Sequence, residues 1–198
     1  MKRSQTKHET LQQTNEQILN AAQQLFMEKG YRAVTTRDIA AKCGISQPAL
    51  YYHYPNKQTL YIAMLEMFVS SIQSKLEAIS EETTAKRLET MLEVLSEEHP
   101  TSIMMMIHDI FVEFSEDNQR YIYFLWKQTY LEPFVRIFEE MKLDNLLRDT
   151  ITPDAAARFC LLTVGQDMSA GGSKESDSLT GRYASLVDLI LHGTQKPD

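Results

Sequence analysis

The sequence predicts an all-α protein of about nine helices. Of its 198 residues, 43% are hydrophobic and 24% are charged, a balance typical of a chain that folds around a core. It holds only seven glycines and six prolines, and no run of alternating Val, Ile or Thr residues indicates a strand. Apolar residues recur instead at helical spacing along most of the chain.

Charge divides the chain into a basic N-terminal part and an acidic body. Residues 1–60 carry eight Lys and Arg against four Asp and Glu, whereas residues 61–198 carry twelve against twenty-three. A basic part can lie against an anionic partner that an acidic body would repel. We therefore expect an N-terminal domain over residues 1–60 and a second helical domain over residues 61–198.

Cysteine usage and hydropathy favour a cytoplasmic protein. Cys43 and Cys160 are too far apart in the sequence to form a metal or redox motif. The longest apolar run, residues 103–107, is too short to span a bilayer, and residues 1–14 lack the apolar stretch of a signal peptide.

The first helix is expected to begin after Thr14, which opens a capping box, and to end at Gly30. Glycine suits the left-handed conformation that often closes a helix. Ahead of this helix, Lys2, Arg3 and Lys7 lie in a tail that either adds phosphate contacts or stays solvated.

Two short helices joined by a tight turn come next. Thr35 and Asp38 form a capping box for a helix that stops at Gly44. Ser46 can cap the following helix, and Pro48 is tolerated in its first turn because amides there have no intrahelical partner. Such a pair is a helix-turn-helix. Its inward residues are expected to be Ile39, Ala40, Cys43, Ile45 and Leu50.

The outer face of the third helix combines amide, hydroxyl and imidazole groups. Positions four apart share a face, as Gln47 and Tyr51 do. A glutamine can address a base edge, while Tyr, His and Lys donate to phosphate. Taken alone, the Tyr-rich cluster is better explained as a half-buried packing face, but the capping pattern, the turn and the charge asymmetry favour a nucleic-acid surface.

The run TTRDIAAKCGISQPALYYHYPNKQTLYIAML, residues 35–65, resembles the DNA-binding segment of the TetR (tetracycline repressor) family of bacterial regulators. The matching features are T-T-R-x-I-A, then G-I-S at the turn, then L-Y-Y-H-Y and N-K. The resemblance implies a homodimer with an N-terminal helix-turn-helix domain. It also implies a C-terminal helical bundle that dimerises and binds a small molecule, which weakens binding to a palindromic operator.

The resemblance also implies roles for single residues. Arg37 would reach a base edge or a phosphate, and the opening of the third helix would enter the major groove. Ala49 departs from relatives with a polar residue there, so its methyl can touch thymine but cannot donate. Either Tyr51 or Tyr52 can instead pack inward. The expected DNA-binding residues are Thr36, Arg37, Gln47, Pro48, Ala49, Tyr51, Tyr52, His53 and Lys57.

Later helices are expected to form the bundle. Pro133 either kinks the longest of them or begins a new segment. A helix that starts at Thr101 is apolar on most sides, as expected of a buried helix. These helices are expected over residues 56–82, 85–99, 101–117, 118–147, 153–172 and 178–195.

A pocket for a lipophilic effector is expected within the bundle, because bundle interiors supply apolar cavities with few polar groups. Plain core packing is the alternative explanation of the same Met and aromatic stripes. Asp109 and Glu113 either select a cation or lie on a solvated face. The expected lining residues are Met64, Met104, His108, Phe111, Tyr123, Trp126, Tyr130 and Phe134.

Surplus apolar surface on the last two helices favours a two-fold dimer interface, with a purely intramolecular bundle as the alternative. Two reading heads on a two-fold axis require a palindromic site in double-stranded DNA.

No pattern for catalysis, a cofactor or a metal site occurs in the sequence, since the five histidines form no HExxH-type pair and no Gly-rich loop precedes Lys-Ser. Cys43 either senses oxidants or is a small buried residue. The sequence thus predicts a ligand-responsive transcriptional regulator, a repressor by resemblance, rather than an enzyme. A helical protein-interaction module is the alternative.

Overall fold

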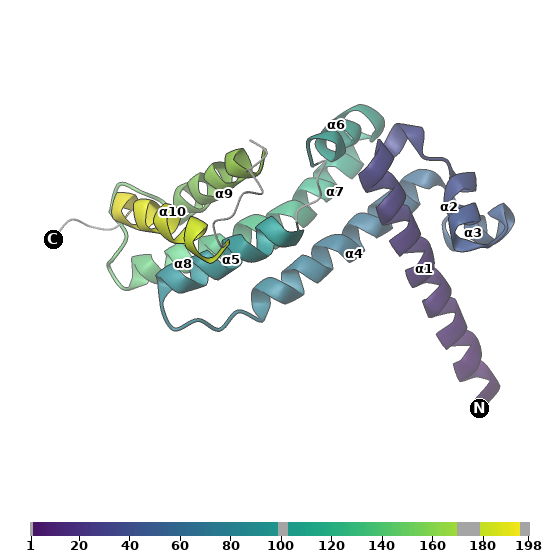
Figure 1. Ribbon diagram of the computed structural model, residues 1–198, viewed down its shortest axis with the longest axis horizontal. Coiled ribbons are helices and arrows are strands. Elements are labelled where there is room, and N and C mark those ends of the chain that lie inside the picture. The colour runs from purple at the N-terminus through teal and green to yellow at the C-terminus, as the bar shows by residue number, and fades with distance from the viewer. Residues whose placement is uncertain (1, 99–102, 170–178, 195–198) are drawn as a thin grey trace. The chain divides into compact units, whose positions relative to one another are not determined.

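The computed structural model describes residues 2–98, 103–169 and 179–194, and the elements of secondary structure in these ranges are all helices (Figure 1). Helix α7, the π-helical turn η1 and α8 follow one another without a break, so that nine separate helices are described, as predicted. They are α1 (Lys2–Ala33), α2 (Thr36–Cys43), α3 (Gln47–His53), α4 (Lys57–Glu77), α5 (Thr84–Glu98), α6 (Ile103–Glu113), α7 (Glu116–Trp126), η1 (Lys127–Leu131), α8 (Glu132–Leu143), α9 (Pro153–Ser169) and α10 (Leu179–Thr194).

Two compact units make up the chain. The first comprises residues 1–68 and 100–123, and the second comprises residues 69–99 and 124–198. The boundary expected at residue 60 lies inside α4, which contributes to both units. The early part of α4 belongs with the N-terminal helices because Leu60, Tyr61 and Met64 are buried in the core that α1 and α2 also line.

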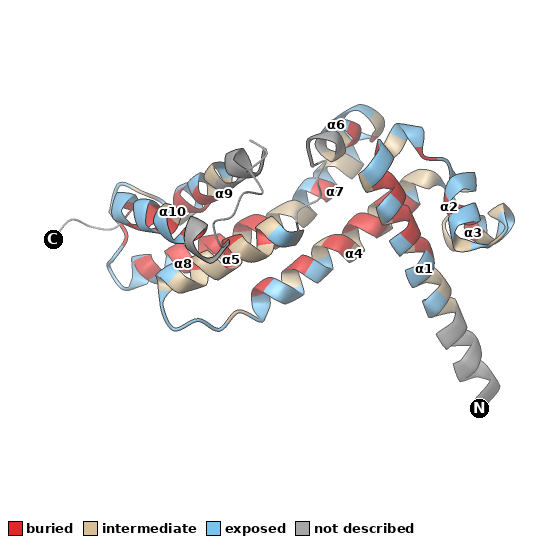
Figure 2. Ribbon diagram, viewed as in Figure 1, coloured by how far each residue is buried: buried red, intermediate tan, exposed pale blue. Residues whose placement is uncertain are grey.

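The core of the first unit joins α1 to α4, and Figure 2 shows the buried positions along both helices. Ile18 and Phe26 on α1 are almost fully buried. The ring of Tyr61 lies edge-on to that of Phe26, with ring centroids 4.9 Å apart. Aromatic pairs in this geometry add to the stabilisation that burial gives.

Helix α1 begins earlier than predicted, and its regular helical geometry is interrupted at Gly30, where the helix was expected to end. It already runs through Thr14, so the predicted capping box there is wrong, since the preceding residues continue the helix. Gly30 has the predicted positive φ of 80°, but its ψ of 165° is extended rather than left-handed helical. Lys2, Arg3 and Lys7 belong to this helix, and their side chains lie outside the described part of the chain.

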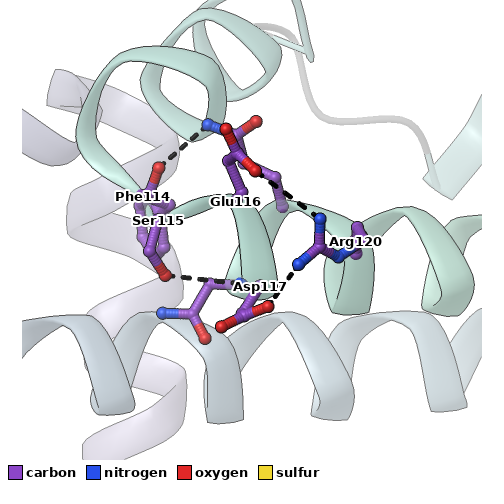
Figure 3. A network of polar contacts seen from close by, with 7 residues as sticks. Phe114, Ser115, Glu116, Asp117 and Arg120 are labelled. Carbon is purple, nitrogen blue, oxygen red and sulfur yellow. Dashed lines mark hydrogen bonds and ion pairs between the residues drawn. The ribbon is translucent and has the colours of Figure 1, made fainter.

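The turn from α6 to α7 is held by its own polar groups (Figure 3). Ser115 caps α7 by accepting the Asn118 N–H at 3.5 Å, and the Gln119 amide donates to the Phe114 carbonyl at 2.9 Å. Arg120 pairs with Glu116 at 3.6 Å and also with Asp117. The predicted cap at Thr101 lies outside the described residues.

In the second unit α5 packs on α10, and α8 packs on α9. Pro133 lies in the first turn of α8, which follows α7 and the π-helical turn η1 without a break. A proline has no N–H to continue the α-helical ladder. The π-helical turn η1 absorbs this break, with the Glu132 N–H bonded to the Lys127 carbonyl. Arg87 on α5 pairs with Glu140 on α8 at 2.7 Å.

No helix in the described ranges is long and apolar enough to cross a membrane. Both cysteines are free thiols. Cys160 is fully buried in α9, and burial raises its pKa to about 12.

Candidate nucleic-acid interface

Helix α2 begins and ends as its sequence predicts. The Asp38 N–H donates to Thr35 Oγ1 at 3.2 Å, and the Thr35 N–H donates back to Asp38 Oδ2 at 2.8 Å. The Thr35 hydroxyl also donates to Asp38 Oδ2, at 2.6 Å, and the hydrogen bonds from the Thr35 hydroxyl and N–H to this carboxylate lower the pKa of Asp38. Gly44 closes the helix in the left-handed conformation, with φ of 68°, which a residue with a side chain rarely adopts. The turn that aims α3 is therefore set locally.

Ser46 caps α3, because its Oγ accepts the Ala49 N–H at 3.3 Å. Asn56 caps α4 in the same way and accepts the Thr59 N–H at 2.8 Å. The predicted inward face is confirmed. Ile39, Ala40 and Leu50 are buried, and Cys43 and Ile45 pack against them while half-buried.

Cys43 fits the structural alternative better than the oxidant-sensing one. Its Sγ donates to the Gln17 carbonyl on α1 at 3.7 Å, and burial raises the pKa of the thiol. A raised pKa reduces the thiolate population on which oxidation depends.

Thr36, Gln47 and Tyr51 meet on the outer side of the helix-turn-helix. Gln47 Nε2 donates to Thr36 Oγ1 at 3.1 Å, and Thr36 Oγ1 lies 3.1 Å from Tyr51 Oη. Gln47 Nε2 also lies 3.5 Å from Tyr51 Oη, in a longer and weaker contact. We call these three residues the polar triangle. It joins the first residue of α2 to the first two turns of α3.

The two tyrosines of α3 are both exposed, so neither packs inward. Tyr52 is 77% exposed and Tyr51 is 44% exposed. Arg37 and Pro48 are exposed as well, and Ala49 is half-buried. Arg37 and Tyr52 are thus the predicted residues that project freely from the surface.

His53 and Lys57 already have partners within the first unit. His53 Nδ1 is hydrogen-bonded to Asn15 Oδ1 on α1. The ammonium of Lys57 lies 4.0 Å from the centre of the Tyr31 ring. Burial lowers the pKa of Lys57, and the charges of Glu113 and Asp109 oppose that shift. The predicted phosphate contacts of both residues therefore require a change of side-chain position.

Helix α6 fastens the end of α1 through two carboxylates. Asp109 is 5% exposed, and its Oδ2 accepts the Tyr31 N–H at 2.6 Å. Glu113 pairs with the Arg32 guanidinium, and its carbonyl accepts a hydrogen bond from the Gln58 amide on α4 at 3.3 Å. The solvated-face explanation is therefore wrong for Asp109. The break at Gly30, which leaves a nearby amide without a helical partner, was the signal for this site in the sequence.

The apolar side of α6 is not buried all round, contrary to the sequence prediction. Phe111 is 69% exposed and Val112 is 49% exposed, and His108 is exposed too. The physical reason is that the packed side of α6 is the one that carries Asp109. The side chain that faces α1 is polar because it satisfies a backbone group there.

The expected pocket residues are distributed over the two units. Met64 is buried in the core of the first unit. Phe111 and the half-exposed Tyr123 are also in the first unit, but not in its core. In the second unit Phe134 is fully buried, and the rings of Trp126 and Tyr130 stack with centroids 6.4 Å apart. The side chain of Met104 lies outside the described part. The pocket stays a prediction.

Sequence reasoning also missed two buried polar atoms. Tyr61 Oη and Glu93 Oε1 are buried without a hydrogen-bond partner. Burial first, and the nearby Asp109 second, raise the pKa of Tyr61. Within the described residues no three His, Cys, Asp or Glu side chains are placed to hold a metal ion.

Comparison with known proteins agrees with this geometry. Residues 18–64 match a family model described as bacterial regulatory proteins of the tetR family. The match covers α2, α3 and the early part of α4, together with the half of α1 that packs on them.

Curated relatives are similar over different lengths. The uncharacterised HTH-type transcriptional regulator YvkB of Bacillus subtilis is 45% identical over 64 residues, which are 32% of this chain and 34% of YvkB. The chain thus spans about a third of that relative. The HTH-type transcriptional repressor KstR2 of Rhodococcus jostii is 28% identical over 191 residues, or 91% of each chain. These relatives are transcriptional regulators rather than enzymes.

Solved structures share the fold over nearly the whole chain. The structure of AibR in complex with isovaleryl coenzyme A and operator DNA has a TM-score of 0.68 at 18% sequence identity. The similarity covers 90% of this chain and 98% of AibR.

Proposed function

We propose that this chain, which belongs to the TetR family of bacterial regulatory proteins, is a transcriptional repressor that binds operator DNA and leaves it when a small molecule binds. The observation that carries the proposal is the helix-turn-helix of α2 and α3. Its apolar side is buried, and its outer side presents Arg37, the polar triangle and Tyr52. A helix pair with a buried apolar side and an exposed polar side is suited to bind a polar partner such as DNA.

On DNA, the start of α3 would enter the major groove, with Gln47, Pro48 and Ala49 at the bases. Arg37 and Tyr52 project freely, so they would need no rearrangement to reach bases or phosphates. Lys57 would have to leave the Tyr31 ring. A half-exposed cation–π contact is worth only about 0.5–1 kcal/mol, so attraction to a phosphate can offset its loss.

Ligand control would reach the reading surface through α6. Asp109 and Glu113 hold the residues that directly follow the Gly30 break, and Thr35, which caps α2, lies four residues beyond Tyr31. A ligand that favours another position of α6 would therefore shift the helix-turn-helix. The binding of isovaleryl coenzyme A by AibR supports an acyl-thioester or similarly lipophilic effector as the first class to test.

Dimerisation would use the exposed apolar side chains of α9 and α10. Phe159 and Leu162 on α9 are 56% and 68% exposed, and Leu189 on α10 is 71% exposed. Phe159 and Leu162 are three residues apart and share a face of α9, and a contiguous exposed apolar patch commonly marks an interface. A Leu162→Glu variant should sediment as a monomer at micromolar concentration and keep its helical spectrum, whereas a wild-type monomer would contradict this part of the proposal.

The proposed function is tested by selecting bound duplexes from random DNA with the wild-type protein. We expect a palindromic site whose binding constant falls steeply with salt. Arg37→Ala should weaken binding at least about tenfold without changing the oligomeric state, since it removes one charged contact. Arg136→Ala, which removes an exposed arginine from α8, is the matched control.

Release is tested on the selected duplex by adding isovaleryl coenzyme A and a panel of apolar small molecules. A ligand that releases the wild type and leaves the circular dichroism spectrum helical is the expected result. If wild-type protein selects no sequence, and its weak binding does not respond to salt, the helical interaction module replaces the repressor.

A further inference from the structure

The polar triangle fixes the amide of Gln47 before anything binds to it. Its Nε2 donates to Thr36 Oγ1 at 3.1 Å and, more weakly, to Tyr51 Oη at 3.5 Å, and the two hydroxyl oxygens are themselves 3.1 Å apart. The members come from two helices, since Thr36 opens α2 while Gln47 opens α3. Each contact therefore restrains the glutamine relative to both helices of the motif.

The arrangement turns the donor end of the amide toward the protein and leaves its acceptor free. A glutamine amide has two N–H bonds and one carbonyl oxygen. Nε2 faces the hydroxyls of both Thr36 and Tyr51, and no donor in the described part of the chain reaches Oε1. Gln47 is half-buried, so this free acceptor is the atom through which it can meet a partner.

We propose that Thr36 and Tyr51 are positioning residues which hold Gln47 so that its Oε1 reads an exocyclic amino group in the major groove. This proposal rests on the DNA-binding function proposed above. The amino groups that point into the major groove are N6 of adenine and N4 of cytosine. Gln47 therefore selects adenine or cytosine on the strand it touches and disfavours guanine and thymine.

A glutamine without the triangle behaves differently. When its amide turns freely, it can donate to N7 and accept from N6 of the same adenine, which is a two-bond contact specific for adenine. The triangle keeps the donors away from N7. A glutamine held by the triangle is therefore expected to make one hydrogen bond, from a base amino group to Oε1. A freely turning glutamine would make two hydrogen bonds to adenine.

Selection with the wild-type protein first defines the operator. The base pair that Gln47 contacts is then the one at which Gln47→Ala abolishes the dependence of affinity on base identity. At that base pair Thr36→Val and Tyr51→Phe, which remove only the hydroxyls, should each reduce base discrimination by about tenfold. The slope of log affinity against log salt should stay that of the wild type, because neither variant removes a charged group. Thermal unfolding by circular dichroism verifies that both variants fold.

Tyr121→Phe is the matched control, since it removes a tyrosine hydroxyl from an exposed position on α7, outside the helix-turn-helix. It should leave base discrimination unchanged, and any loss of affinity should be equal for all duplexes. If Thr36→Val and Tyr51→Phe leave base discrimination unchanged, as this control does, or weaken binding equally for all duplexes, the proposal is overturned.

Base analogues test the atom that is read. Replacing the selected adenine by purine, or the selected cytosine by pyrimidin-2-one, deletes the amino group and should weaken wild-type binding as much as Gln47→Ala does. Replacing the purine of that base pair by its 7-deaza analogue deletes N7 and should cost nothing. A loss with the 7-deaza duplex would show that Gln47 donates to N7, and the proposed orientation would be wrong.

Wild-type protein that selects no sequence at all would overturn the repressor function itself. Specific wild-type binding with unchanged discrimination in Thr36→Val and Tyr51→Phe would overturn only the positioning role.

Discussion

The helix-turn-helix and α6 lie in the same compact unit, yet apolar residues are buried in the first and a polar residue is buried in the second. In the helix-turn-helix the buried residues are apolar, such as Leu50, and Gln47 lies on the outer side. Among the described side chains of α6 the buried one is the carboxylate of Asp109, and the aromatic ring of Phe111 is 69% exposed. Hydrophobic periodicity therefore places residues correctly where a helix is bounded by its own caps, and fails where a neighbouring helix needs a polar partner.

Truncation of the apolar core of α3 should have the largest effect. Leu50 is 1% exposed, so Leu50→Ala removes buried methyl groups and leaves a cavity, at a cost of about 3 kcal/mol. Urea unfolding followed by circular dichroism measures the change. Leu143→Ala, at a site that is 86% exposed, should change stability by less than about 0.5 kcal/mol. Equal effects of the two variants would mean that α3 does not pack on its neighbours.

Removal of the polar core of α6 comes next. Asp109→Ala leaves the Tyr31 N–H without its acceptor and should cost about 2 kcal/mol in the same assay. Asp109→Asn keeps a carbonyl oxygen at the site, so it should cost less than the alanine variant. Asp117→Ala, which removes an exposed carboxylate of α7, is the control. A loss with Asp117→Ala as large as with Asp109→Ala would contradict the special role of the buried group.

Loss of the α3 cap should have a smaller effect. Ser46→Ala removes the acceptor of the Ala49 N–H and should destabilise the protein by about 1 kcal/mol. Ser46→Asp restores an acceptor and should return most of that stability, as measured by urea unfolding. If aspartate and alanine are equivalent at this position, the cap contributes nothing and α3 is held by Leu50 alone.

The stabilisation that the capping box of α2 provides should be lost in acid. The pKa of Asp38 is lowered in the folded state, so its contribution to stability is complete above the pKa of the unfolded chain. That contribution disappears as the pH falls through the lower folded pKa. The stability difference between wild type and Asp38→Asn should therefore shrink below about pH 4. Urea midpoints of both proteins from pH 6 downward measure it, and a constant difference would contradict the assignment.

Truncation of the exposed ring of α6 should have the smallest effect. Phe111→Ala is expected to change the free energy of unfolding by less than about 0.5 kcal/mol, because the ring is already largely in water. The neighbouring Phe114 is 5% exposed, so Phe114→Ala should cost about 3 kcal/mol or more. A large loss with Phe111→Ala would show that another surface covers this ring in solution.

The helix-turn-helix was predictable because its signals are local. The Thr35 and Asp38 box, the Gly44 end and the Ser46 cap each depend on residues within a few positions, and each is present in the structure. The prediction failed at Thr14, where a capping pattern lies inside a continuous helix. A capping sequence acts only where the chain enters a helix, and the preceding residues decide whether it does.

The site itself was predictable as a set of residues but not as an arrangement. The spacing of four residues placed Gln47 beside Tyr51, which the structure confirms. It gave no indication that Thr36, eleven residues earlier, completes the polar triangle, or that His53 turns back to Asn15. Such contacts depend on the angle between two helices.

The sequence by itself determined the all-helical fold, the start and end of α2 and α3 and which of their faces is exposed, because capping and periodicity act over one or two helical turns. Only the tertiary structure decided that Asp109 is core, that Lys57 rests on Tyr31 and that Gln47 is held by two hydroxyls. These side chains interact with groups on segments that are distant in sequence, and only folding brings such groups within contact distance.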